Sequence, residues 1–162
     1  METKSGRNLP DEKQVELGLE IHLGYWLRRV SNRVSGAFAR ALHARSVSVA
    51  EWVLLRHLQE RQSMTPGELA DALGLTRGAV SKVLDKLVEK NWIARATKPE
   101  DNRVQLISLT RQGRRVIPQL AEIADRNDQD FFDCLDADER ATLRRLLRKL
   151  ADFHRIKDVP IQ

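Results

Sequence analysis

Residues Leu69–Leu87 read LADALGLTRGAVSKVLDKL, and this stretch indicates how the chain is organised. Its two ends are helical in composition, but Gly74, Thr76 and Gly78 interrupt the middle. Each glycine inside one continuous helix would cost about 1 kcal/mol relative to alanine. The break therefore predicts two short helices joined by a tight turn, because Gly74 can close the first helix and Thr76 can cap the second.

The residue types around the break fit a helix-turn-helix, a motif whose second helix can enter the major groove of DNA. Ala70 is small where the two helices would cross closely, and Val80 would fill the space between them. On a 3.6-residue period, the remaining faces of the second helix carry short polar residues and long cations. The candidate DNA-contacting residues of this helix are Thr76, Arg77, Gly78, Ser81, Lys82 and Lys86.

These side chains have different expected roles at a DNA surface. Arg77 has the donor geometry to read guanine, Ser81 can bond a base or a phosphate, and Lys82 is expected to meet phosphate. Gly78 would permit close approach of the backbone. In isolation the same residues would fit an ordinary solvated helix face, because charged side chains normally lie outside. The hairpin and the charge that accompany this helix favour DNA contact.

A β-hairpin is expected after this helix. Trp92–Ala96 and Val104–Leu109 have strand-like composition and partial alternation, with a charged turn between them. Beside a helix-turn-helix such a hairpin forms a wing, and Lys98 and Arg103 would bring cations to the minor groove or the DNA backbone. Asp101 is expected to orient the Arg103 guanidinium across the turn. The alternative is an ordinary hairpin ion pair with no role in DNA binding.

Positive charge gathers in the same region. Residues 76–103 contain seven Lys and Arg against four Asp and Glu, a net charge of +3, whereas residues 48–75 carry −2. The whole chain carries a formal charge of +5. This distribution favours an anionic partner at the second helix and the hairpin.

Composition restricts the remaining classes of protein. The 162 residues suit about one domain, and no apolar run approaches the roughly 20 residues that span a bilayer. The charged start METKSGRNLPDEKQ does not read as a signal peptide. A single cysteine, Cys134, rules out an intrachain disulfide framework and a cysteine-rich zinc site. We therefore expect a cytoplasmic protein with no membrane contact.

Helices with one apolar stripe are expected at both ends of the chain. One runs from about residue 12 to 45, a length that is hard to cover within so small a domain and indicates a partner chain. Two more follow Thr110, which can cap the first of them. Capping boxes at Ser48, Thr65 and Asp136, each with Glu three residues later, predict further helix starts. In the middle helices the residues expected to be buried are Val49, Trp52, Val53, Leu58, Val80, Val83, Leu84, Leu87 and Val88.

The sequence resembles the MarR family of bacterial transcription regulators over roughly residues 12–155. The resemblance lies in ELADALGLTRGAVSKVLDKLVEKNWI, the wing ATKPEDNRVQLISLT and the LTRQG helix start, flanked by helices. It implies a mainly α fold with a small β-wing, in which both chain ends supply a helical dimerisation region. The expected parts are a flexible N-terminus over 1–11, the dimerisation region over 12–47 and 111–157, and a winged helix-turn-helix over 48–110.

The resemblance also implies a function. The family implies a homodimer on double-stranded palindromic operator DNA, more often a repressor, released by a small aromatic or phenolic ligand. A regulator without an effector, or an activator, is the alternative. Because the family's effector pocket lies between the dimer helices and the winged helix, the candidate lining residues here are Tyr25, Trp26, Arg29 and Trp52.

Other chemistry has little support in the sequence. Cys134 and the four histidines lack motif context, and no glycine-rich phosphate loop follows a strand, so we expect no enzyme, no cofactor and no metal site. A winged helix used for protein contact would expose apolar side chains on its second helix, unlike this one. Cys134, between Phe132 and Leu135 late in the fifth helix, is expected to be a packing residue rather than a redox sensor.

Overall fold

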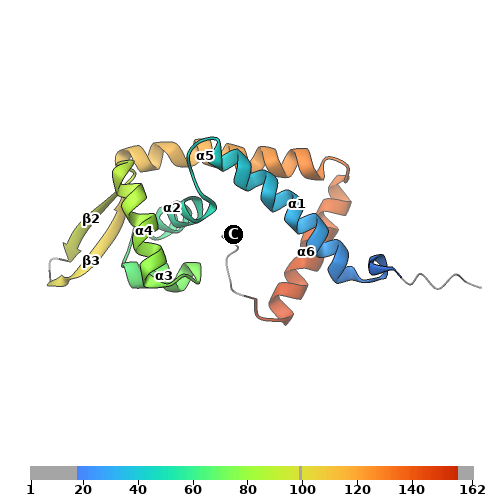
Figure 1. Ribbon diagram of the computed structural model, residues 1–162, viewed down its shortest axis with the longest axis horizontal. Helices are drawn as coiled ribbons and strands as arrows, with labels where there is room; N and C mark the ends of the chain where they lie inside the picture. The colour runs from blue at the N-terminus through green and yellow to red at the C-terminus, as the bar shows by residue number, and fades with distance from the viewer. Residues whose placement is uncertain (1–17, 99, 157–162) are drawn as a thin grey trace, which may run out of the picture. The chain divides into compact units, whose positions relative to one another are not determined.

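The computed structural model describes residues 18–98 and 100–156, so the expected flexible N-terminus over 1–11 lies outside the described residues. The chain divides into two compact units, Met1–Arg33 and Val34–Gln162, with the division inside the first long helix. The elements in chain order (Figure 1) are η1 Leu19–Ile21, α1 Leu23–His43, α2 Val49–Arg61, β1 Ser63–Met64, α3 Pro66–Leu73, α4 Arg77–Glu89, β2 Ile93–Lys98, β3 Asp101–Leu109, α5 Arg111–Phe132 and α6 Ala137–Phe153.

The first long helix begins later than the sequence predicts. The expected single helix from about residue 12 to 45 is wrong in its described part, because α1 starts at Leu23 and a separate 3₁₀ turn precedes it. His22 between the two has extended backbone angles, φ −93° and ψ 123°, which interrupt the helix. Residues 12–17 lie outside the described residues. Apolar residues recur on both sides of His22, so their spacing did not mark this boundary.

Four helix starts follow the local rules that the sequence predicts. Ser48, Thr65 and Asp136 each open a capping box, and both reciprocal hydrogen bonds are present in all three. Thr110 caps α5, since its hydroxyl accepts the N–H of Gly113 at 3.0 Å. Each cap satisfies an N–H group that the first turn of a helix leaves free.

A hydrophobic core in the second unit holds the three helices α2, α3 and α4 against the sheet. From α2, the fully buried side chains are Leu54, Leu55 and Leu58. The sequence predicted only the last of these, and its other choices, Val49, Trp52 and Val53, are partly buried at the edge of this core. Leucines on adjacent positions both lie inside because α2 is covered on more than one side.

The buried side of α4 is largely as predicted. Val80, Leu84 and Leu87 are 0 to 2% exposed, and Val83 is partly buried against them. Val88 was expected to be buried as well, and this is wrong, since 42% of it is exposed. It follows Leu87 by one position, which turns it about 100° away from the core on a helix.

The hairpin belongs to a three-stranded antiparallel sheet with the order β1-β3-β2. Ile93 and Ile107 are buried at its inner end, whereas β2 is exposed beyond Ile93. The strands reach further toward the tip than predicted, to Lys98 on β2 and back to Asp101 on β3. The two-residue strand β1, which pairs with the end of β3, was not predicted because it is too short to show alternation.

Helix α6 carries apolar side chains that the described chain leaves uncovered, unlike α5. In α5, Ile117 and Leu120 are buried in the core, but α6 has no fully buried residue. The exposed apolar stripe of α6 consists of Leu146 at 44%, Leu147 at 42%, Leu150 at 51% and Phe153 at 80%. Over residues 18–98 and 100–156, none of the helices is both long and apolar enough to cross a membrane.

Candidate nucleic-acid interface

The interruption between α3 and α4 is a tight turn. Gly74 has a φ of +63°, the left-handed conformation that closes α3 and that glycine adopts without strain. Thr76 then caps α4, because its hydroxyl accepts the N–H of Ala79 at 3.2 Å. Ala70 and Val80 are 5% and 0% exposed where the two helices pack. The predicted helix-turn-helix is confirmed.

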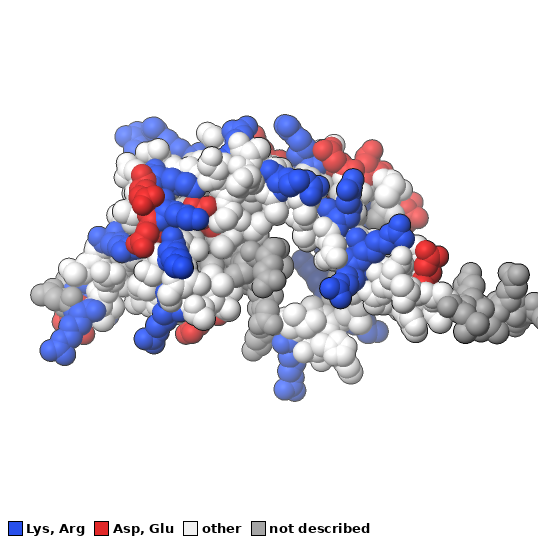
Figure 2. Space-filling view, viewed as in Figure 1, with Lys and Arg blue, Asp and Glu red and all other residues white. Residues whose placement is uncertain are grey.

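The candidate residues of α4 lie on its solvent side. Leu84 and Leu87 face the core, which leaves the opposite side of the helix open. The exposed residues there are Thr76, Arg77, Gly78, Ser81, Lys82 and Lys86. Figure 2 shows Lys and Arg side chains over α4 and the hairpin, with acidic side chains beside some of them. Their contact with DNA stays a prediction, but the fold leaves all six accessible.

Gly78 is not required by the packing of the described residues. A Cβ atom built on it would meet nothing within 4 Å, and its backbone is ordinary α-helix. Glycine in a helix is unfavourable by about 1 kcal/mol relative to alanine. A glycine that the local packing does not need is consistent with the predicted close approach of another molecule to this turn of α4.

An ion pair ties the wing to α4. Arg95 on β2 places Nη2 2.5 Å from Oδ1 of Asp85 on α4. Asp85 is an exposed acidic residue beside the predicted contact residues of the helix, and a free carboxylate there would repel phosphate. This pairing was not predicted from the sequence. The period of two in β2 places Arg95 on the same face of the strand as Ile93, but it does not indicate which acidic residue Arg95 would meet.

The hairpin tip differs from the prediction in one contact. Asp101 Oδ1 accepts the backbone N–H of Arg103 at 3.0 Å. The expectation that Asp101 orients the Arg103 guanidinium is wrong here, since among the described residues no ion pair joins the two side chains. The carboxylate instead fixes the backbone of the turn, a local arrangement that Asp favours. Lys98 and Arg103 are both exposed, with Lys98 Nζ 3.8 Å from a Glu100 carboxylate oxygen.

Three of the four predicted effector-pocket residues form a cluster within the first unit. Tyr25 and Trp26 meet edge to face with ring centroids 5.5 Å apart, and Arg29 donates from Nη1 to the Tyr25 hydroxyl at 3.0 Å. The Arg29 guanidinium lies 5.9 and 5.7 Å from the two ring centroids. The fourth, Trp52, belongs to the second unit, where Arg56 lies 5.6 Å from its ring. A pocket lined by all four stays a prediction.

Cys134 is exposed rather than packed. Helix α5 ends at Phe132, so Cys134 lies in the turn between α5 and α6 and not late in the fifth helix. The expectation of a packing residue is therefore wrong for the described chain. Apolar neighbours in sequence, Phe132 and Leu135, suggested burial, but Cys134 lies beyond the end of α5 and is exposed.

A helix-turn-helix followed by a β-hairpin, with exposed cations on the second helix, defines a winged-helix DNA-binding protein. A sequence profile described as MarR family matches residues 47–104. The multiple antibiotic resistance protein MarR of Escherichia coli is 30% identical over 131 residues, which are 80% of this chain and 91% of that protein. The chain therefore belongs to the MarR family, whose members are transcription regulators and not enzymes.

Two solved structures are similar over most of the chain. A cysteine-to-serine mutant of Escherichia coli MarR in complex with operator DNA is 31% identical with a TM-score of 0.68, covering 81% of this chain and 95% of that one. BpsR of Bordetella bronchiseptica, solved to show how 6-hydroxynicotinic acid regulates its DNA binding, is 25% identical with a TM-score of 0.70. That similarity covers 83% of this chain and 96% of BpsR.

Proposed function

We propose that this chain is a sequence-specific regulator that inserts α4 into the major groove of an operator and lays its hairpin on the adjacent minor groove or backbone. The observation that carries this is the solvent side of α4. It exposes Arg77, Ser81 and Lys82 together, and the carboxylate of Asp85 beside them is neutralised by Arg95. That surface suits a polyanion with readable base edges. The proposed setting is the cytoplasm.

The active form is a homodimer on a palindromic site. The stripe Leu146, Leu147, Leu150 and Phe153 is 42–80% exposed in the single chain, and exposed apolar side chains that share one helix face mark interfaces. Two copies related by a two-fold axis would present two α4 helices. They would engage half-sites about one helical turn of DNA apart, roughly 10 bp between centres. The helical ends, 12–47 and 111–157, supply the dimer contacts in this proposal, and 48–110 supplies the DNA contacts.

Selection of bound fragments from genomic DNA tests the proposal, followed by binding to the recovered site as a function of salt. A dimer that covers about 6–8 phosphates gives a slope near −6 in a plot of log affinity against log salt concentration. Sedimentation or light scattering gives the oligomeric state. A monomer that ignores palindromic DNA at low salt would contradict the proposal.

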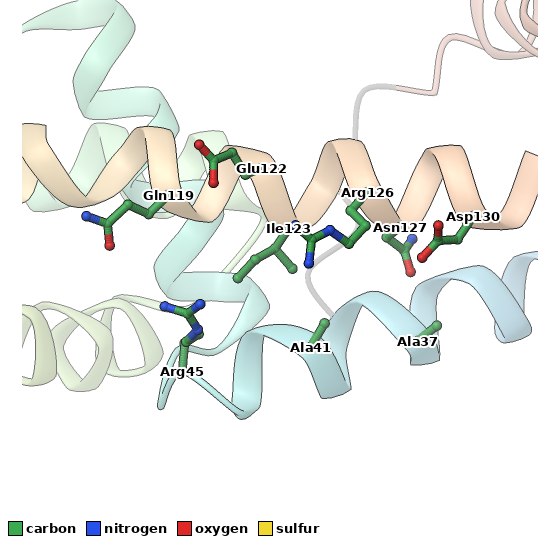
Figure 3. Close-up of a pocket in the computed structure, with 9 residues that line it drawn as sticks. All are labelled: Ala37, Ala41, Arg45, Gln119, Glu122, Ile123, Arg126, Asn127 and Asp130. Carbon is green, nitrogen blue, oxygen red and sulfur yellow. The ribbon is translucent and has the colours of Figure 1, made fainter.

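Repression relieved by a small aromatic acid or phenol is the proposed mode of regulation. In support, BpsR is regulated by 6-hydroxynicotinic acid. The second unit here also holds a cavity of about 390 Å³ between the C-terminal half of α1 and the middle of α5. Figure 3 shows Ala41 of α1 opposite Ile123 and Arg126 of α5, and Ala37 opposite Asn127 and Asp130, with Arg45 at one end. The apolar part of the lining, Ala37, Ala41 and Ile123, suits a flat ring. The polar part contains two arginines, which suit a carboxylate, and also the carboxylates of Glu122 and Asp130.

Coupling between the two sites explains the release. A ligand that binds better to a dimer with wrongly spaced α4 helices lowers operator affinity, and operator DNA lowers ligand affinity by the same factor. A screen of aromatic acids and phenols for release of the selected DNA tests this. If no compound releases the DNA, the alternative of an effector-independent regulator stands. Transcription from the operator with and without the protein separates a repressor from an activator.

A further inference from the structure

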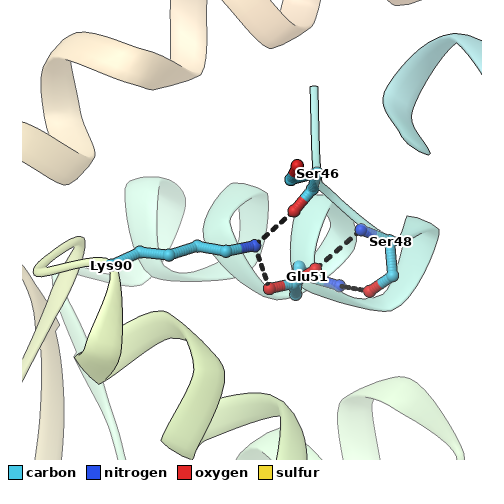
Figure 4. Close-up of polar contacts among 4 residues, drawn as sticks. All are labelled: Ser46, Ser48, Glu51 and Lys90. Atoms are coloured by element: carbon cyan, nitrogen blue, oxygen red, sulfur yellow. Dashed lines mark hydrogen bonds and ion pairs between the residues drawn. The ribbon is translucent and has the colours of Figure 1, made fainter. Parts of the chain in front are cut away.

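Lys90, the C-cap residue that follows α4, makes two contacts with a distant part of the chain. Its Nζ lies 2.6 Å from Oε1 of Glu51 and 2.6 Å from the carbonyl oxygen of Ser46 (Figure 4). Ser46 is 44 residues away in sequence and lies in the turn between α1 and α2. One ammonium group therefore joins the end of α4 to the start of α2 and to the turn after α1.

Glu51 is buried, so its negative charge needs the Lys90 ammonium group as a partner. It is the one charged residue among the buried residues of the described chain, at 3% exposed. Its Oε2 accepts the backbone N–H of Ser48 at 2.7 Å, which leaves Oε1 for Lys90. Burial raises the pKa of Glu51, but the hydrogen bonds from Lys90 and Ser48 outweigh it and lower the pKa below its ordinary value. A buried carboxylate without its cation would be strongly unfavourable.

The residues that follow Lys90 also contact the start of α5. Asn91 has a φ of +56°, and its carbonyl oxygen accepts the Thr110 hydroxyl at 2.7 Å. The next carbonyl, of Trp92, accepts the Thr110 backbone N–H at 3.0 Å. Gly113 packs so close that a Cβ atom there would lie 2.0 Å from the Trp92 oxygen. The end of α4 is thus bound both to the α1–α2 turn and to the start of α5.

We infer that Lys90 is a positioning residue for operator recognition, which rests on the proposed function. By joining the end of α4 to Glu51 and to the Ser46 carbonyl, it fixes the direction of the recognition helix relative to the turn that leaves α1. A change in α1 then reaches the recognition helix through this contact. Lys90 itself does not touch DNA in this account.

A stability effect alone would not establish this role, because a lost buried ion pair weakens many folds. Two measurements separate positioning from stability. The first is the discrimination among operators whose half-sites are moved apart or together by one base pair, since a helix held in one direction tolerates one spacing best. The second is amide hydrogen exchange, which needs no DNA.

The variants are Lys90→Met, Glu51→Gln and the double variant, with Arg61→Met as the matched control. Arg61 is exposed at the end of α2, so its replacement measures the effect of one lost positive charge in the same unit. Glu51→Gln keeps an acceptor for the Ser48 N–H but loses the charge. Lys90→Arg keeps the charge and is the conservative variant.

In hydrogen exchange, we expect Lys90→Met to accelerate exchange at the amides of Ser46 and Val47, far away in sequence, as well as at Asn91 and Trp92. Glu51→Gln accelerates the same set, and Arg61→Met does not. Unchanged exchange at Ser46 and Val47 in a folded Lys90→Met protein would overturn the inference. If Lys90→Met does not fold, Glu51→Gln decides by the same criterion.

In DNA binding, we expect Lys90→Met and Glu51→Gln each to reduce the discrimination between half-site spacings by about three- to tenfold. This corresponds to the lower part of the range of coupling energies between two residues that contact each other in a protein. The double variant is no worse than either single one, and Lys90→Arg retains most of the discrimination. Loss of affinity with an unchanged spacing preference refutes the positioning role. Failure of the unaltered protein to bind DNA at all refutes the proposed function instead, and hydrogen exchange then tests only whether Lys90 holds the end of α4 to the turn between α1 and α2.

Discussion

Arg95 on β2 and Asp85 on α4 form an ion pair, with Nη2 2.5 Å from Oδ1. The pair links the wing to the recognition helix and neutralises the Asp85 carboxylate on the predicted DNA-contacting side. Both side chains remain partly exposed, so the pair adds at most about 1 kcal/mol to stability. Under the proposed function, the pair matters because it neutralises a carboxylate that would otherwise repel the DNA phosphates.

Replacing Asp85 tests this reading. We expect Asp85→Asn to change the free energy of unfolding by less than about 1 kcal/mol. Affinity for non-specific DNA rises and its salt dependence steepens, because Arg95 becomes free to meet phosphate. Arg95→Gln is the opposite variant, since it leaves the carboxylate unpaired and weakens binding to every sequence. Equal DNA binding by the two variants would show that neither side chain lies near DNA.

Two glycines give a matched pair for separating fold from function. Gly78→Ala is expected to stabilise the protein by up to about 1 kcal/mol, because it removes a helix glycine with open space around it. Under the proposal, operator affinity nevertheless falls, since the added methyl group lies where the DNA backbone approaches. Thermal unfolding and DNA titration measure the two effects. Undiminished operator affinity would remove Gly78 from the interface.

Gly113→Ala is expected to have the opposite effect on stability from Gly78→Ala. The added Cβ would lie 2.0 Å from the Trp92 carbonyl oxygen. Backbone atoms at that distance cannot give way cheaply, so we expect a loss of about 3 kcal/mol or more in unfolding free energy. Operator binding falls only in proportion to the unfolded fraction. A stable Gly113→Ala protein would mean that α5 starts further from Trp92.

Arg77 and Lys82 are expected to differ in what they contribute to binding. Arg77→Ala relaxes the preference at one operator position by about 1–3 kcal/mol, because a bidentate contact to a base is lost. Lys82→Ala weakens binding to all sequences alike and lowers the salt slope by about one charge per subunit. Binding to a set of singly substituted operators distinguishes them. An unchanged profile for Arg77→Ala would exclude that residue from base readout.

Acid unfolding reports on Glu51. Its pKa in the folded protein lies below the ordinary value of 4.5, so its stabilising effect is complete above that pH and is lost as the pH falls through the folded pKa. We expect Glu51→Gln to cost about 1.5–3 kcal/mol at pH 7. The difference from the unaltered protein narrows below pH 4.5. Urea denaturation of both proteins from neutral to acid pH measures it, and a pH-independent difference would contradict the account.

Cys134 offers a test of redox control. The thiol is exposed in the turn after α5, so Cys134→Ser is expected to change stability by less than about 0.5 kcal/mol. We also expect operator binding of the variant to respond to peroxide as that of the unaltered protein does. If peroxide releases DNA from the unaltered protein only, Cys134 is a redox switch after all.

The sequence by itself determined the features that depend on near neighbours. The three capping boxes, the left-handed Gly74 and the Thr76 and Thr110 caps all formed as predicted. Each involves groups within about four residues of one another, so backbone geometry and side-chain chemistry are sufficient. The solvent side of α4 followed for the same reason, because helical periodicity fixes which residues share a face.

The tertiary structure alone decided the contacts that join separate elements. Glu51 and Lys90 are 39 residues apart, and the spacing of charges in the sequence does not say which lysine reaches a buried glutamate. Asp85 and Arg95 meet only because β2 folds back beside α4. Such pairs depend on how whole elements pack, and packing energy is a sum over many residues that no short stretch contains.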